Sequence, residues 1–200
     1  VQKYFYWWRD DRLLEKINHR LLFECREAHG RSPHPSAGVI DSQSVKTTES
    51  GGITGFDAGK NIKGRKRHIL TDTEGFLVTA LVHAADVQDR DGAPAVLMEA
   101  RDKFPWLRHI FADGGYAGDK LKRKLKKVGP FRMEIIKRSD KMKGFKVLPR
   151  RWVVERTFAW LGRSRRLAKD WERCWTSAIA WLFMAHIRIA TRRLARACFI

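Results

Sequence analysis

Residues 67–82 read RHILTDTEGFLVTALV, two apolar segments separated by four residues that favour a turn. Short apolar runs joined through Asp72, Glu74 and Gly75 are typical of a β-hairpin. Upstream, residues 38–41 form a further short apolar run that ends in an acid, and residues 48–64 are polar, glycine-rich and typical of a loop. The segment therefore predicts three strands of one sheet, with the hairpin as the second and third.

Helices and strands alternate after the hairpin. Asp91 can cap a helix with Pro94 in its first turn, and Val96, Ala100 and Phe104 line one face. The other predicted elements are helices at 11–29, 117–127, 151–162 and 177–197, and strands at 107–112 and 133–136. Three hairpin-type strands followed by alternating helices and strands predict an α/β fold, a ribonuclease-H-like mixed sheet flanked by helices.

The charge of the chain favours a polyanionic partner. The 200 residues are 44% hydrophobic, enough for one good-sized folded domain, and hold 41 Lys and Arg against 22 Asp and Glu, a net charge of +19. The basic surplus is concentrated after residue 116. Because basic side chains that neutralise phosphates release condensed counterions, we expect DNA or RNA as partner; a generally basic soluble protein is the alternative.

Cysteine spacing and hydropathy indicate the compartment. Cys25, Cys174 and Cys198 form no paired motif, which points to a reducing environment and no zinc site. The chain opens with aromatic and charged residues rather than a signal peptide. The longest apolar stretch near the C-terminus, residues 178–185, is too short for a membrane span. We therefore expect a cytoplasmic protein with no membrane partner.

Two aspartates share a sequence context. Asp41 and Asp113 each follow a short apolar run and precede small or polar residues. If the two strands are adjacent and parallel, both carboxylates emerge at the same edge of the sheet. Carboxylates that close repel one another unless one is protonated or a cation neutralises them. Oxygen ligands at such an edge suit Mg²⁺, or Mn²⁺ in its place.

Glu155 is the third candidate acid. It lies on the predicted helix 151–162, whose apolar face includes Val154, Phe158 and Leu161. A salt bridge to Arg151, one turn away, is the structural alternative. Together with the two aspartates, Glu155 could hold two metal ions roughly 3.5–4 Å apart. Such a site would catalyse phosphodiester hydrolysis, followed by attack of the freed 3′-hydroxyl on another strand.

Several blocks together resemble the DDE transposases of insertion sequence family five. They are DSQSVKTT (41–48), GKNIKGRKRH (59–68), VHAADVQDRD (82–91), ADGGY (112–116) and RWVVERTFAWL (151–161). The resemblance covers about residues 35–196. It implies a ribonuclease-H-like catalytic domain over residues 35–200, with Asp41, Asp113 and Glu155 as catalytic, metal-binding residues. It also implies a Mg²⁺ or Mn²⁺ cofactor, insertion-sequence ends and target DNA as partners, and a homo-oligomer.

The sequence departs from the family pattern in two places. Residues 1–34 are short for an N-terminal DNA-binding region, so we expect a helical remnant of it plus a connector. The wider superfamily carries Tyr, Arg, Glu and Lys at fixed spacing. Arg151 and Glu155 fit that spacing, whereas Leu148 replaces the Tyr and Gly162 the Lys, with Arg163 one place later. A catalytically idle or hydrolysis-only DNA-binding remnant of a transposase is therefore the alternative function.

Basic side chains near these acids are the predicted DNA contacts. Residues 60–67 carry a basic run that a lysine-protected edge strand would also explain, and residues 120–127 equally suit a solvated helix face. The predicted contacts are Lys60, Lys63, Arg65, Lys66, Arg67, Lys120, Arg151, Arg156 and Arg163.

Other polar and aromatic residues have simpler explanations. His68 and His83 lie on or beside strands, where packing or hydrogen bonding accounts for a histidine more often than metal binding. Asp86, Asp89 and Asp91 suit a helix N-terminus. Trp152 and Trp160 could insert between bases, but packing of the helix is the safer interpretation.

Overall fold

A computed structural model describes residues 2–49, 51–136 and 150–198 of the chain. The strands are β1 (Ala37–Lys46), β2 (Gly55–Asp57), β3 (Ile62–Asp72), β4 (Leu77–Ala84), β5 (His109–Ala112) and β6 (Arg132–Ile135). The helices are α1 (Gln2–Asp10), α2 (Leu13–Ala28), α3 (Asp89–Arg101), α4 (Asp119–Val128), α5 (Arg151–Gly162) and α6 (Trp175–Cys198). Single 3₁₀ turns, η1 (Gly114–Tyr116) and η2 (Arg165–Leu167), complete the list.

The six strands form one mixed sheet. Its order is β2-β3-β1-β5-β6, and β4 also pairs with β3. The pairs β1–β3, β2–β3 and β3–β4 are antiparallel, whereas β1–β5 and β5–β6 are parallel. The hairpin between β3 and β4 turns on Asp72, whose Oδ1 accepts hydrogen bonds from the backbone N–H groups of Glu74 and Phe76. The predicted α/β, ribonuclease-H-like mixed sheet is confirmed.

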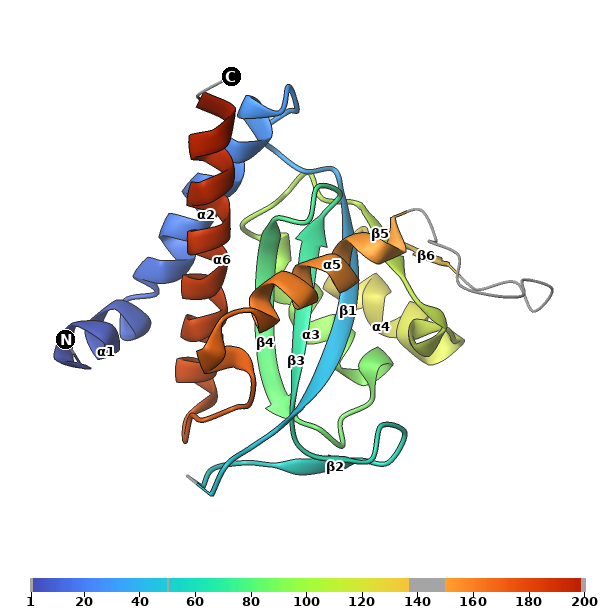
Figure 1. Ribbon diagram of the computed structural model, residues 1–200. Helices are drawn as coiled ribbons and strands as arrows, with labels where there is room; N and C mark the ends of the chain where they lie inside the picture. Colours follow the sequence, from blue (N-terminus) through green and yellow to red (C-terminus); the bar gives the residue numbers. More distant parts are fainter. Residues whose placement is uncertain (1, 50, 137–149, 199–200) are drawn as a thin grey trace, which may run out of the picture.

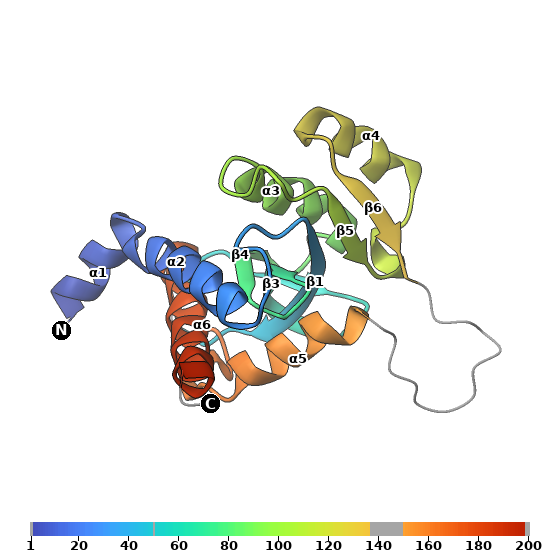
Figure 2. The same ribbon diagram turned by 90° about the horizontal axis from the view of Figure 1, so that it is seen from above.

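Helices cover both faces of the sheet (Figures 1 and 2). Figure 2 shows α3 and α4 on one side of the strands and α5 and α6 on the other. Successive strand residues alternate between the two cores: Ile40 and Leu70 belong to the α3 and α4 side, and Val39 and Ile69 to the α5 and α6 side. Buried residues of α2, which runs alongside α6 in Figure 1, join the same packing.

The strands extend beyond their apolar sequence. β1 continues from the predicted 38–41 run to Lys46, and β3 begins at Ile62, five residues before the predicted hairpin strand. The short strand β2 lies within the predicted loop 48–64, and α1 lies within the segment 1–34 that was expected to be helical, although its bounds were not predicted. Helix α3 begins at Asp89 with Gln88 as N-cap, so Asp91 is in its first turn and is not the cap.

The cysteines, the apolar segments and the residue that replaces the superfamily tyrosine were also singled out in the sequence. Cys25 is buried and Cys174 is exposed, and both are free thiols. Within the described residues, no helix combines the length and apolar character needed to cross a lipid bilayer. Leu148, which replaces the tyrosine of the superfamily pattern, lies outside the described residues.

Candidate active site

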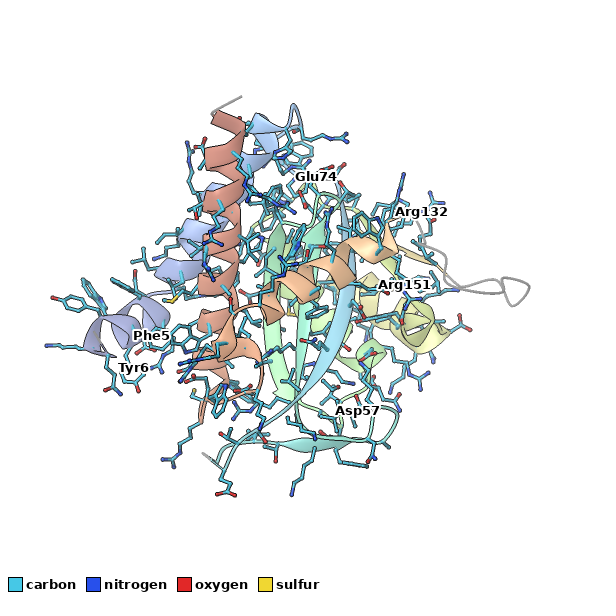
Figure 3. The ribbon with its side chains drawn as sticks, viewed as in Figure 1. Phe5, Tyr6, Asp57, Glu74, Arg132 and Arg151 are labelled. Carbon is cyan, nitrogen blue, oxygen red and sulfur yellow. The ribbon has the colours of Figure 1, made fainter. Side chains whose placement is uncertain are left out.

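The two aspartates lie on neighbouring parallel strands. Asp41 is within β1, and Asp113 directly follows β5. The parallel register pairs Val39 with Phe111, so continuing it by two residues places Asp41 beside Asp113. Both line one small pocket together with Arg151, which Figure 3 labels on α5. The predicted adjacency of two parallel strands is confirmed, but Asp41 lies in the middle of β1, so the two carboxylates meet beside the end of β5 and not at two strand ends.

Burial makes the Asp41 carboxylate costly to ionise. Its pKa is raised from 3.8 to about 7, first by loss of hydration and then by the nearby carboxylates of Asp113 and Asp89. Two groups oppose this: the Ser42 backbone N–H, which donates to Asp41 Oδ1 at 2.7 Å, and the positive charge of Lys60. Ionising Asp41 therefore costs free energy that a bound cation would offset.

Arg151 connects the second and third acids. One of its terminal nitrogens lies 3.7 Å from Asp113 Oδ2, and its Nε lies 3.3 Å from Glu155 Oε1. The other Asp113 oxygen, Oδ1, accepts the backbone N–H of Gly115 at 2.8 Å, which fixes the start of η1. The Glu155 side chain is 51% exposed, so it can rotate without disturbing the core. The salt bridge that the sequence offered as an alternative is present.

The acids offer oxygen donors of the kind that Mg²⁺ and Mn²⁺ prefer. Among the described residues, no three His, Cys, Asp or Glu side chains stand close enough to hold a metal ion in the observed rotamers. The Arg151 guanidinium bridges Asp113 and Glu155, and Asp41 is the acid with the strongest need of a neutralising cation. The donor set therefore fits a divalent cation, provided that Arg151 and Glu155 change rotamer.

Asp89 is a further acid at the site that the sequence interpretation treated as part of a helix N-terminus. Its Oδ1 accepts the Ser42 hydroxyl at 2.6 Å and lies 2.9 Å from the Lys66 ammonium. It also raises the pKa of Asp41. The block 82–91 contains Asp89, but nothing in the spacing of that block distinguishes it from Asp86 or Asp91.

The two histidines near the site are structural. His68 is fully buried, and its Nε2 is 2.6 Å from the Tyr116 hydroxyl. Its Nδ1 is 3.5 Å from Nε2 of His83. Burial lowers the pKa of His68 to about 3, so its ring is neutral at physiological pH. The structure thus agrees with the packed, hydrogen-bonded interpretation of these residues.

Three of the predicted DNA contacts are wrong, because their side chains are inside the protein. Arg65, Lys66 and Arg67 are 2%, 5% and 3% exposed. Lys66 pairs with Asp89 and donates to the Val87 carbonyl. The two arginines donate instead to backbone carbonyls at the end of η2 and in the segment between η2 and α6: Glu172 and Arg173 for Arg65, Leu167 and Lys169 for Arg67. Charge pairing and carbonyl binding offset the cost of burying these cations.

The remaining basic residues are accessible to different degrees. Lys60, Lys63, Lys120 and Arg163 are exposed, and Lys120 pairs with Asp91 at 3.0 Å. Arg151 is half-buried in its contacts with the acids.

Arg156 is only partly available. It donates to the Glu74 carbonyl at 2.9 Å. Its guanidinium carbon also lies 4.4 Å from the ring centre of Trp152 and 4.5 Å from that of Trp160. These two rings pack on an arginine of their own helix, which favours the packing interpretation of the tryptophan pair.

Comparison with known proteins identifies the family. Residues 32–189 match the family described as "Transposase DDE domain". A protein of Burkholderia cepacia described as "Putative transposase for insertion sequence element IS402" is 32% identical over 117 residues, which are 55% of this chain and 54% of that protein. The chain thus spans about half the length of this curated relative. Because the family match extends over most of the chain and includes the whole site, the chain belongs to the transposase DDE domain family.

Proposed function

We propose that the chain is a transposase of insertion sequence family five that performs metal-dependent DNA cleavage and strand transfer. Asp41, Asp113 and Glu155 are its proposed catalytic, metal-binding residues. The observation that carries the proposal is the half-buried Asp41 carboxylate beside Asp113, with Glu155 joined to the same site through Arg151.

The proposed cofactor is Mg²⁺ or Mn²⁺. When bound, the metal would activate the attacking oxygen and stabilise the leaving oxygen of an in-line displacement. Asp41 would supply a ligand from within β1, Asp113 from the position directly after β5, and Glu155 from the exposed side of α5. The protein's part is to hold these oxygens around the scissile phosphate.

Basic residues around the acids would position DNA. Lys60 lies 3.4 Å from the Ser42 carbonyl, next to Asp41, so its ammonium is the exposed cation that we place nearest to the scissile phosphate. Once Arg151 releases Asp113 and Glu155, its guanidinium can contact a phosphate oxygen. Lys63, Lys120, Arg156 and Arg163 remain proposed contacts to the DNA backbone farther from the acids.

Cleavage of DNA carrying the element's ends tests the assignment. Asp41→Asn, Asp113→Asn and Glu155→Gln each remove a charged ligand while nearly keeping side-chain volume, and each should abolish Mg²⁺- or Mn²⁺-dependent cleavage. Asp119→Asn is the matched control, because the Asp119 side chain is 86% exposed on α4. Cleavage that persists in all three site variants would reject these acids as the catalytic group.

The alternative is a catalytically idle or hydrolysis-only DNA-binding protein, because Arg151 occupies Asp113 and Glu155 in the observed rotamers. Calorimetric titration with Mn²⁺ tests the idle form, because an idle remnant need not retain metal binding. An assay for joined strands tests the hydrolysis-only form, because hydrolysis alone leaves nicks and no strand-transfer product.

The wider organisation is proposed on the same basis. Residues 35–200 would be the catalytic domain, and residues 1–34 helical sequence of a DNA-binding region plus a connector. Two transposon ends must be held together for transposition, so we propose a homo-oligomer bound to insertion-sequence ends and target DNA, acting in the cytoplasm.

A further inference from the structure

An open groove of about 1120 Å³ lies at the end of β1 beyond Asp41. It is bordered by the start of the β1–β2 connection, by β2 and the start of β3, and by the segment between η2 and α6. Lys46, Lys63 and Lys169 line it together with Phe56 and Trp171, and Glu49 is the one carboxylate among the described lining residues. The groove therefore combines positive charge with two flat rings.

Buried contacts hold the two sides of this groove together. Arg65, which is 2% exposed, donates to the Ile53 carbonyl on one side and to the Glu172 and Arg173 carbonyls on the other. Thr47 and Asp170 form a parallel β-bridge between the same segments. The groove is thus a fixed feature of the fold and does not depend on surface rotamers alone.

The glycine at position 52 permits this close approach of the two segments. Gly52 has φ of +93°, and a Cβ there would lie 2.2 Å from the Arg173 carbonyl oxygen. A side chain would therefore be strained and would also collide with backbone. Gly52 therefore lets the two segments lie this close together, and Phe56 and Trp171 border the same groove.

The aromatic residues of the groove are presented to solvent. Phe56 is 52% exposed and Trp171 is 42% exposed, which is unusual for large apolar side chains unless they serve a contact. Phe56 is the cross-strand partner of Lys63 in the β2–β3 pair, and the Lys169 ammonium lies 5.9 Å from the ring centre of Trp171. Each ring thus has a lysine beside it.

We propose that this groove binds a single-stranded segment of DNA, with bases on Phe56 and Trp171 and phosphates against Lys46, Lys63 and Lys169. Rings beside cations form the usual surface for unpaired nucleic acid, because every base has a face that can stack. In duplex DNA those faces are covered by neighbouring bases. The inference rests on the proposed function only in taking DNA as the substrate.

The position of the groove relates it to the site of cleavage. Lys46 is five residues along β1 from Asp41, which at about 3.3 Å per residue is about 16 Å. A strand that leaves the scissile phosphate along β1 would reach the groove within a few nucleotides. The groove would then hold DNA that has lost its complement near the cut.

Fluorescence anisotropy with a labelled oligothymidine and an abasic oligonucleotide of equal length and charge tests the proposal. Wild-type protein should bind the oligothymidine more tightly. Phe56→Ala and Trp171→Ala should each weaken that binding about 5- to 150-fold and leave binding of the abasic strand unchanged. Phe56→Trp, which keeps a ring, should bind like wild type. Trp106→Ala is the matched control, because Trp106 is 64% exposed and does not line the groove.

The results separate this inference from the proposed catalysis. Asp41→Asn should bind the oligothymidine like wild type while losing cleavage. Equal affinity of wild-type protein for the two strands, or alanine variants that lose both equally, would overturn the stacking groove. Circular dichroism spectra that match wild type would confirm that the alanine variants are folded. If wild-type protein cleaves DNA and the alanine variants of Phe56 and Trp171 bind the oligothymidine like wild type, the groove is rejected and the catalytic assignment stands.

Discussion

The Asp41→Asn variant should be more stable than the wild-type protein in the absence of divalent cations. Burial and the neighbouring acids raise the pKa of Asp41 from 3.8 to about 7. The folded protein therefore binds this proton more tightly than the unfolded chain does. Asparagine has nearly the same shape, accepts the Ser42 N–H through its carbonyl oxygen, and carries no charge that burial can penalise.

The sign and size of the effect follow from proton linkage. Between pH 4 and pH 7 the folded state holds a proton that the unfolded state has released, so the free energy of unfolding falls as the pH rises. A displacement of one pH unit corresponds to about 1.4 kcal/mol. A pKa of about 7 in place of 3.8 thus lowers the free energy of unfolding of the wild-type protein by about 4 kcal/mol across this range. Above pH 7 this loss stays constant.

Urea unfolding in EDTA, followed by circular dichroism from pH 4.5 to pH 8, measures the difference between the two proteins. Other titrating groups such as Asp72 and His186 are present in both and cancel. The advantage of the asparagine variant should grow with pH and level off above pH 7, and Mg²⁺ should reduce it by stabilising the wild type alone. Asp119→Asn should show no such divergence. A pH-independent difference between Asp41→Asn and wild type would refute the reasoning.

Three further substitutions, one of them a control, test the charge pairs around the fold and the site. Arg26 and Asp72 are both buried and lie 2.5 Å apart, so Arg26→Leu should cost about 3–5 kcal/mol in urea unfolding. Arg20→Leu is the control, because it removes the exposed partner of Glu24 and should lower the free energy of unfolding by less than about 1 kcal/mol. Equal losses of stability in the two variants would show that burial of the pair does not matter. Arg151→Gln should bind Mn²⁺ about fivefold more tightly in calorimetry, because two part-exposed ion pairs no longer compete for the acids; unchanged or weaker affinity would show that Arg151 does not compete.

Local sequence signals predicted most of the helices and the hairpin. Helix α5 has the predicted bounds 151–162, because its apolar positions repeat with helical spacing. The hairpin was marked by the turn from Asp72 to Gly75, where the Asp72 carboxylate binds backbone N–H groups. The predicted end of β1 was too early, because Ser42, Ser44 and Lys46 interrupt the apolar run. Its pairing with β3 and β5 maintains the strand, and a single strand's composition does not encode those partners.

The candidate site was predictable in its members but not in its electrostatics. The proximity of Asp41 and Asp113 could be predicted from the apolar run before each, because these runs form adjacent parallel strands, although β1 continues past Asp41. The role of Asp89, the first residue of α3, could not be predicted from the sequence. It depends on contacts with Ser42 on β1 and Lys66 on β3. The bridge from Arg151 to Asp113 likewise joins a helix to a strand end nearly forty residues earlier in the chain.

The basic run 60–67 shows why charge alone does not identify a DNA contact. β3 lies between β1 and β4, and helices cover both faces of the sheet. Its side chains must therefore point alternately into the two covered faces, and a buried cation persists there only with partners. For Arg65 these are Asp170 and carbonyls more than a hundred residues away, and for Lys66 they are Asp57 and Asp89. The neighbouring Lys60 and Lys63 lie outside the span of β4, remain exposed, and so are the residues of this run that can reach a phosphate.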